Sequence, residues 1–254
     1  MNKNTAAENF SKNAHMYDDY TVVQKKCASK LIDSIKKADA PNILELGCGT
    51  GFYTRLLREK FKNSRIKALD VSQNMIDVAQ NKVPDVTFNV ADAERFNCDE
   101  KFDLITSNAA FQWFGSFPET VMKLKNLLKK DGHLLFSVYG PETFKELDEV
   151  ISFHFGKKEW ITSSRFLPGD TLKSLLGEHF SNIDLIEENF KVDFLTLWEF
   201  LKNIKRSGTR GDGIKKDIFL GKYRMREIER TYIEKFKGII ATHHVYFCSA
   251  WGDR

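Results

Sequence analysis

Apolar runs and amphipathic segments alternate along the first 140 residues of the chain. Short apolar runs predict buried strands, and apolar positions at helical spacing predict the helices between them. Strands that alternate with helices are typical of a mostly parallel sheet covered by helices on both faces. The predicted strands are residues 43–46, 65–70, 86–90, 102–107 and 133–139; the predicted helices are 21–37, 53–61 and one through Val121 that ends near Asp131 and Gly132.

The pattern changes after Gly140. Residues 141–154 are predicted to be helical, as is a segment that opens at 166–170 and continues to Leu176. Residues 183–194 and 242–251 are predicted to be the last two strands, and the mainly helical stretch of about 197–237 is an insertion between them. The chain is therefore expected to form a single α/β domain over residues 1–254, with a doubly wound, mostly parallel, seven-stranded sheet.

Three glycines follow the first predicted strand at alternate positions: Gly47, Gly49 and Gly51. Glycines permit positive φ and let a ligand approach the main chain, and the next helix turns its free amide groups toward that ligand. A dinucleotide fingerprint would have a further glycine where this chain has Phe52, and Glu45 places a carboxylate beside the loop. The pattern favours a cationic ligand and resembles the first motif of class I methyltransferases, which use the sulfonium compound S-adenosylmethionine.

Carboxylates end the second and third predicted strands. Asp70 lies about twenty residues beyond the glycine loop, where an acidic side chain can accept both hydroxyls of a ribose. Asp92 follows the third strand, where it can accept from the amino group of an adenine. Ser72 is a candidate helix cap, and Met75 is placed either to lie against the adenine ring or to pack in the core.

An aromatic loop follows the fourth predicted strand. Phe111, Trp113 and Phe114 lie within four residues, and the amides of Asn108 and Gln112 flank them. The carboxyl end of a strand in a parallel sheet opens onto the ligand crevice, so cofactor and substrate are expected to meet here. The alternative is an aromatic helix that only packs in the core.

The first 20 residues are polar, with few bulky side chains. Tyr17 and Gln24 are spaced so that both can reach one site if the first helix begins early. An aromatic arm of this kind, residues 1–37 with its helix, is expected to cover a bound cofactor. The alternative is that Tyr17 only packs the arm against the core.

Charge is unevenly distributed along the chain. Residues 201–230 hold ten Lys and Arg residues against four Asp and Glu residues, although the net charge of the whole chain is only +4. Such a block is commonly a solvated helical face, but beside an active site it would attract an acidic partner. Nucleic acid would satisfy the same charge, but no recognised nucleic-acid motif accompanies it, so an acidic protein is at least as good a candidate partner.

Several site classes are disfavoured by composition. The four cysteines contain no C-x-x-C pair, and the adjacent His243 and His244 would point to opposite faces of a strand, so no metal site is expected. No apolar run approaches the length of a membrane span, and the first residues do not resemble a secretion signal. A cytoplasmic protein without a membrane contact is expected.

Motifs along nearly the whole chain resemble one family, the malonyl-acyl-carrier-protein O-methyltransferases of biotin synthesis. The glycine loop alone indicates only the superfamily, whereas the later phrases are more specific. Residues 129–132, Lys-Lys-Asp-Gly, depart from the family's usual proline and glycines in that loop. The phrases that carry the resemblance are residues 17–24, 44–51, 107–113, 136–147 and 198–209.

The resemblance implies the class I methyltransferase fold, S-adenosylmethionine as methyl donor, S-adenosylhomocysteine as product, and no metal. Residues 38–140 would then form the cofactor-binding half and residues 141–254 the substrate-side half. The cofactor-binding residues that it implies are Tyr17, Gln24, Glu45, Gly47, Cys48, Gly49, Thr50, Gly51, Asp70, Val71, Met75, Asp92, Ala93, Asn108, Ala109 and Phe111.

The resemblance also implies methyl transfer to the free carboxylate of a malonyl thioester. Tyr17, Phe111 and Trp113 would cover the reacting centre, and Arg206 or Arg210 would orient the carboxylate, with Arg165 less favoured. An acidic carrier protein would dock on the basic residues 202–230. The same thioester on coenzyme A, a free small acid or quinone precursor as substrate, and a non-catalytic binding protein remain alternatives.

Overall fold

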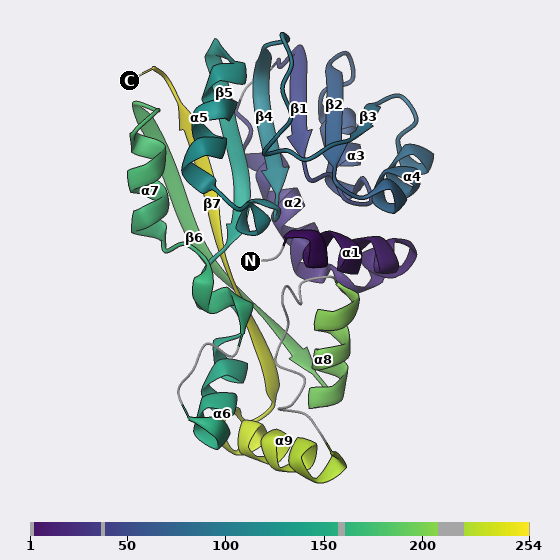
Figure 1. Ribbon diagram of the computed structural model, residues 1–254, viewed down its shortest axis with the longest axis vertical. Helices are drawn as coiled ribbons and strands as arrows, with labels where there is room; N and C mark the ends of the chain where they lie inside the picture. Colours follow the sequence, from purple (N-terminus) through teal and green to yellow (C-terminus); the bar gives the residue numbers. More distant parts are fainter. Residues whose placement is uncertain (1–2, 37–38, 157–160, 208–220, 254) are drawn as a thin grey trace.

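The computed structural model describes residues 3–36, 39–156, 161–207 and 221–253. One seven-stranded sheet runs through the molecule in the order β3-β2-β1-β4-β5-β7-β6 (Figure 1). Neighbouring strands are parallel except that β7 is antiparallel to both β5 and β6, so the predicted doubly wound sheet is confirmed. The strands are β1 (Asn42–Leu46), β2 (Arg65–Asp70), β3 (Thr87–Val90), β4 (Phe102–Asn108), β5 (Leu128–Tyr139), β6 (Asn182–Phe194) and β7 (Ile239–Trp251).

Helices cover both faces of this sheet, and each face has its own apolar core. One core joins α2, α3 and α4 to the sheet, and the other joins α5 and α7 to the opposite face. The α-helices are α1 (Lys3–Asn13), α2 (Val22–Ser34), α3 (Phe52–Lys60), α4 (Gln73–Lys82), α5 (Phe117–Leu127), α6 (Lys145–Phe155), α7 (Gly169–Gly177), α8 (Leu197–Arg206) and α9 (Lys222–Phe236). Three short 3₁₀ helices are η1 (Ala14–Tyr20), η2 (Phe111–Trp113) and η3 (Thr162–Arg165).

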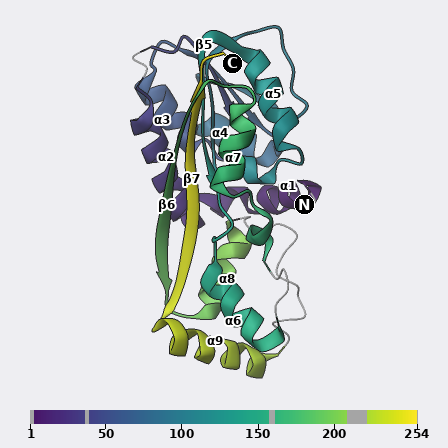
Figure 2. The same cartoon turned by 90° about the vertical axis from the view of Figure 1, so that its left-hand side faces the viewer.

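Strands β6 and β7 extend well beyond the rest of the sheet, and Figure 2 shows them side by side along the molecule. β5 pairs with β7 only between Val245 and Trp251, so the other half of β7 pairs with β6 alone. Helices α6, α8 and α9 pack at the far end of this two-stranded ribbon around a third apolar core, and we call them the helical lobe. The described part of the predicted insertion, residues 197–237, forms α8 and α9.

Two predicted boundaries were wrong. α5 ends at Leu127 rather than near Asp131, because the chain pairs with β4 from Leu128 onward and Lys129 forms an ion pair with Asp103. α6 begins at Lys145 rather than at residue 141. The preceding turn is tied to β7 instead, where the Phe144 amide donates to the Thr242 carbonyl at 2.7 Å.

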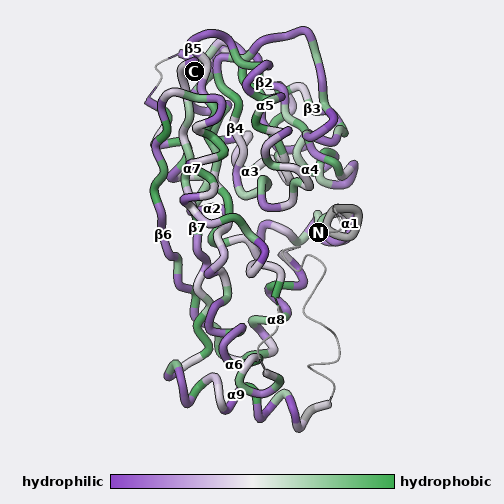
Figure 3. Tube along the Cα trace, turned by 60° about the vertical axis from the view of Figure 1, so that its left-hand side comes forward, coloured by the Kyte–Doolittle hydropathy of each residue, from purple (hydrophilic) through white to green (hydrophobic). Residues whose placement is uncertain are grey.

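The edge strand β6 alternates between exposed and partly buried residues, and Figure 3 shows hydrophilic positions along its length. Charged side chains such as Glu187, Glu188 and Lys191 along an edge oppose pairing with another chain. In the part of the chain that the structure describes, no helix combines the length and the apolar character needed to cross a membrane.

Candidate active site

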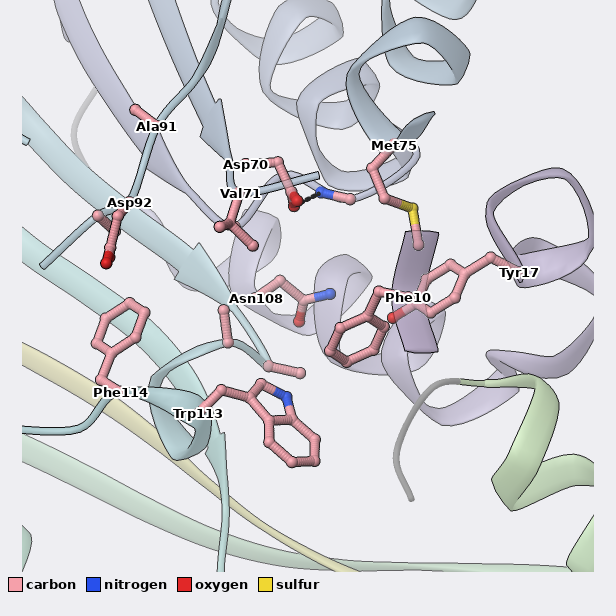
Figure 4. Close-up of a pocket in the computed structure, with 15 residues that line it drawn as sticks. Phe10, Tyr17, Asp70, Val71, Met75, Ala91, Asp92, Asn108, Trp113 and Phe114 are labelled. Carbon is pink, nitrogen blue, oxygen red and sulfur yellow. Dashed lines mark hydrogen bonds between the residues drawn. The ribbon is translucent and has the colours of Figure 1, made fainter. Parts of the chain in front are cut away.

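A cavity opens at the carboxyl ends of β1, β2, β3 and β4, and we call it the strand-end cavity (Figure 4). In a parallel sheet this is the edge at which ligands bind. Apolar side chains form most of its wall, with the carboxylates of Asp70 and Asp92 among them. Its lining residues are Phe10, Tyr17, Gly47, Gly49, Asp70, Val71, Met75, Ala91, Asp92, Ala93, Asn108, Ala109, Ala110, Trp113 and Phe114.

The three loop glycines all have positive φ, but for different reasons. A Cβ at Gly47 would lie 2.5 Å from the Ala110 Cβ, so this glycine permits close approach of two loops. A Cβ at Gly51 would lie 3.0 Å from the Cβ of Ala79, so this glycine packs α3 against α4 and does not line the cavity. Around Gly49 nothing lies within 4 Å, and the space belongs to the cavity.

Asp70 connects the glycine loop to the next strand. One carboxylate oxygen accepts from the Gly49 amide and the other from the Ser72 amide, each at 2.9 Å. Burial raises the pKa of Asp70, although these backbone hydrogen bonds oppose the shift. Each oxygen keeps a further lone pair for a ligand hydroxyl. Ser72 caps α4 as predicted, because its hydroxyl accepts from the Met75 amide.

A smaller cavity lies behind the glycine loop, and we call it the Glu45 cavity. Tyr17, Gln24 and Cys48 line it together with Glu45, whose Oε2 is buried without a hydrogen-bond partner. Burial raises the pKa of Glu45 to about 8. A cationic ligand group in this cavity would favour the ionised carboxylate, so the residues present fit the ammonium end of S-adenosylmethionine.

The N-terminal arm, formed by α1 and η1, lies across the mouth of the strand-end cavity (Figure 4). Phe10 contacts both Tyr17 and Trp113 edge to face, with ring centroids 6.1 and 5.7 Å apart. Burial, with the nearby Asp70 and Asp18 charges, raises the pKa of Tyr17, so its hydroxyl stays a donor. The arm thus closes the cavity with aromatic side chains.

Asp18 fixes the arm to two other segments. Its carboxylate accepts from the Thr50 hydroxyl at 2.5 Å and pairs with Lys82 at the end of α4. Burial alone would raise the pKa of Asp18, but the hydrogen bonds from Lys82 and Thr50 lower it. One side chain therefore joins the arm, the glycine loop and α4.

The aromatic loop divides between the core and the cavity. Phe111 points into the core, where its ring stacks on Phe136 at 4.1 Å, and it does not line the strand-end cavity. Trp113 and Phe114 line that cavity instead. Asn108 is held in place because its side chain donates to the Gln24 carbonyl at 3.0 Å and accepts from Ser137 at 2.8 Å.

The two predicted arginines that the structure describes, Arg165 and Arg206, do not line this cavity. The Arg206 guanidinium donates to the Tyr20 hydroxyl and lies over that ring, 5.1 Å from its centroid, so it binds the arm to α8. Arg165 lines a separate cavity beside Phe111, and Arg210 lies outside the described residues. Much of the basic block, residues 208–220, also lies outside them.

The structure brings together most of the site residues that the sequence indicates, in the strand-end cavity or the Glu45 cavity. Thr50 lines the latter, whereas Gly51 and Phe111 line neither. Sequence reasoning missed Phe10, Ala91, Ala110 and Phe114 as cavity residues. Phe114 belonged to the aromatic loop and could have been included, but Phe10 reaches the site only through the fold of the arm. Within the described ranges, no cluster of three or more His, Cys, Asp or Glu side chains could hold a metal ion.

Comparisons with known proteins agree with this geometry. Residues 43–132 match a family model described as a methyltransferase domain. Among solved structures, the YcgJ protein from Bacillus subtilis superposes with a TM-score of 0.63 at 16% identity, over 90% of this chain and 99% of that chain. Phosphoethanolamine N-methyltransferase 2 of Haemonchus contortus, solved with S-adenosylhomocysteine, gives a TM-score of 0.54 at 18% identity, over 91% of this chain and 53% of that one. At these identities the likeness shows the fold alone.

Curated relatives are more informative because they extend over the whole chain. A malonyl-[acyl-carrier protein] O-methyltransferase of Acetivibrio thermocellus is 33% identical over 98% of this chain and 94% of its own length. A second, from Ilyobacter polytropus, is 34% identical over 97% of this chain and 94% of its own length. The chain therefore belongs to the family of malonyl-[acyl-carrier protein] O-methyltransferases.

Proposed function

We propose that this enzyme transfers a methyl group from S-adenosylmethionine to the free carboxylate of a malonyl group carried by an acyl carrier protein. One observation carries the proposal: similarity to the named relatives covers 97–98% of the chain and so includes the helical lobe. The family model for the methyltransferase domain covers only residues 43–132. A likeness limited to those residues would have supported methyl transfer but would not have indicated a substrate.

The geometry supports a place for each part of the methyl donor. We assign the ribose hydroxyls to Asp70, the adenine amino group to Asp92 and the adenine ring to the wall that contains Met75. The amino-acid end belongs near Glu45, whose buried oxygen lacks a partner. The sulfonium would then face Tyr17 and Trp113.

The chemistry needs no general base. A carboxylic acid with a pKa near 4 is ionised at neutral pH, so the nucleophile is already present. The carboxylate oxygen forms a bond to the methyl carbon, and the electron pair of the carbon–sulfur bond passes to sulfur, which leaves a neutral thioether and a methyl ester. Opposite charges cancel in this step, so a site that excludes water and aligns the two groups supplies the rate. Tyr17 and Trp113 serve this purpose.

The basic face of the helical lobe is our candidate dock for the acidic carrier protein. Lys202 and Lys205 lie exposed on α8, and Trp198 on the same helix is 67% exposed. Exposed positive charge speeds the encounter with an acidic partner, and an aromatic side chain adds apolar contact. The resemblance further implies that the methyl ester product enters biotin synthesis, and a cytoplasmic location stays a prediction.

The test is methyl transfer from labelled S-adenosylmethionine to malonyl carrier protein. Malonyl coenzyme A, free malonate and unmodified carrier protein are run in parallel. We expect label on the malonyl carrier protein as a base-labile ester, and weaker labelling of the coenzyme A thioester because it lacks the acidic protein surface. Labelling of free malonate alone would instead favour the small-acid alternative, and tight binding of S-adenosylhomocysteine without any transfer would favour a non-catalytic role.

A further inference from the structure

Another cavity lies between the sheet and the helical lobe, next to the strand-end cavity. Trp113 lines both cavities, and its ring meets Phe166 edge to face at 6.1 Å. Phe144, Ile161 and Ile204 complete the apolar part of the wall. We call it the Tyr139 cavity after the residue at its sheet side. A group bound there would reach the methyl donor past the indole of Trp113.

Two polar side chains in this cavity have no hydrogen-bond partner among the residues that the structure describes. The Tyr139 hydroxyl and the His243 Nδ1 are both buried and make no hydrogen bond, although their residues are only 4% and 7% exposed. A buried polar group without a partner is costly, and native structures rarely keep one without a ligand or function. Two of them in one cavity indicate that a ligand supplies the missing bonds.

Two other hydroxyls in the cavity are already used by the protein. The Ser163 hydroxyl donates to the Thr143 carbonyl at 2.5 Å, and the Thr143 hydroxyl donates to the His244 carbonyl at 3.0 Å. These bonds hold the turn after β5 against β7. They therefore shape the cavity, whereas Tyr139 and His243 remain available to a ligand.

Both available groups are neutral. Burial raises the pKa of Tyr139 well above its usual value and lowers the pKa of His243 to about 3, so at neutral pH the phenol keeps its proton and the imidazole carries one. A neutral donor can align a carboxylate or a thioester carbonyl with less loss of nucleophilicity than a cation in direct contact would cause.

We propose that the Tyr139 cavity binds the malonyl group, and that the Tyr139 hydroxyl and the His243 imidazole position it by hydrogen bonds beside Trp113. This inference rests on the proposed function and names its acyl site. Residues from β5, η2, the turn after β5, α8 and β7 meet there, so the site exists only where the helical lobe is folded against the sheet.

The experiment compares three single variants by steady-state kinetics, thermal melting and S-adenosylhomocysteine affinity. Tyr139→Phe removes a hydroxyl that has no partner in the free enzyme. It should raise the melting temperature, because a costly unpaired hydroxyl is removed, leave S-adenosylhomocysteine affinity unchanged and lower kcat/KM for malonyl carrier protein by about tenfold. His243→Leu should act in the same direction, and His243→Asn, which returns an amide near the Nδ1 position, should recover part of the loss.

Tyr232→Phe is the matched control. Tyr232 is an equally buried tyrosine of the helical lobe, but its hydroxyl donates to the Ile240 carbonyl at 2.6 Å and does not line the cavity. This variant should melt at a lower temperature and keep its kcat/KM. Tyr139→Phe should thus lower activity without lowering the melting temperature, whereas Tyr232→Phe should lower the melting temperature without lowering activity.

Two results would overturn the inference while the proposed function stands. One is that the wild-type enzyme methylates malonyl carrier protein while Tyr139→Phe and His243→Leu each lose less than threefold in kcat/KM for that substrate. The other is a parallel loss of S-adenosylhomocysteine affinity, which would place both residues in the donor site. A wild-type enzyme that binds S-adenosylhomocysteine but never labels malonyl carrier protein would overturn the proposed function and this acyl site together.

Discussion

The two halves of the molecule build their sites in different ways. On the donor side, the site is formed mainly by backbone geometry, with glycines at positive φ and carboxylates at the ends of successive strands. On the side of the helical lobe, the Tyr139 cavity is assembled from side chains that lie up to 130 residues apart, from Trp113 to His243. A local sequence pattern can encode the first kind of site but not the second.

The largest expected effect comes from breaking the backbone of the donor side. Gly47→Ala places a Cβ 2.5 Å from the Ala110 Cβ at a φ of +67°. We expect S-adenosylhomocysteine affinity to fall by more than about 100-fold in isothermal titration, with a lower melting temperature, because the loop must move and the residue is strained.

Gly49→Ala is the control for that change. Its Cβ meets nothing within 4 Å of the protein, so the stability cost is only the strain of positive φ, about 1–2 kcal/mol. Donor affinity should still fall, because the methyl group occupies the cavity itself. Equal melting temperatures for the two variants would contradict the close packing of Gly47.

An effect on stability rather than on donor affinity, visible as pH dependence, is expected at Glu45. Burial raises its pKa to about 8 from the usual value near 4.5, so the unfolded state loses the proton first and the fold loses stability as pH rises from about 4.5 to 8. In the ligand-free enzyme, the free energy of unfolding should fall by on the order of 4 kcal/mol over this pH range. The Glu45→Gln variant should not show this fall. Denaturant melts at pH 5 and pH 8 measure it, and an identical pH dependence in both proteins would contradict the burial of an uncompensated carboxyl.

The smallest of these effects tests whether the halves are separable. Phe200 is fully buried in the helical lobe, where it stacks on Phe194 at 5.0 Å and meets Phe144 edge to face. Phe200→Leu should cost about 1–2 kcal/mol and raise KM for malonyl carrier protein. S-adenosylhomocysteine affinity should not change, and a parallel loss of that affinity would show that the lobe and the donor site act as one unit.

The position of the strand-end cavity could be predicted from the sequence because its signals are local. Glu45, Gly47 and Gly49 come from one stretch, and Asp70 and Asp92 end strands whose apolar runs are plain. The mostly parallel sheet and the capping role of Ser72 agree with those signals. Where the sequence pattern located both a strand and its end, it also located a residue that lines the cavity.

The errors arose where tertiary contacts outweigh local pattern. Phe111 and Phe114 are equally aromatic, and only packing against Phe136 decides which of them turns inward. Phe10 reaches the site because residues 3–13 form a helix whose position depends on the rest of the fold. Tyr139 and His243 read as ordinary strand residues, since their lack of partners is visible only in three dimensions.

The ribbon of β6 and β7 has a mechanical consequence. Its last six residue pairs, from Asn189 and His244 to Phe194 and Ile239, have no third strand beside them. Two-stranded ribbons twist more readily than wide sheets. We therefore expect the outer part of the ribbon, which carries the helical lobe, to twist more readily than the central sheet.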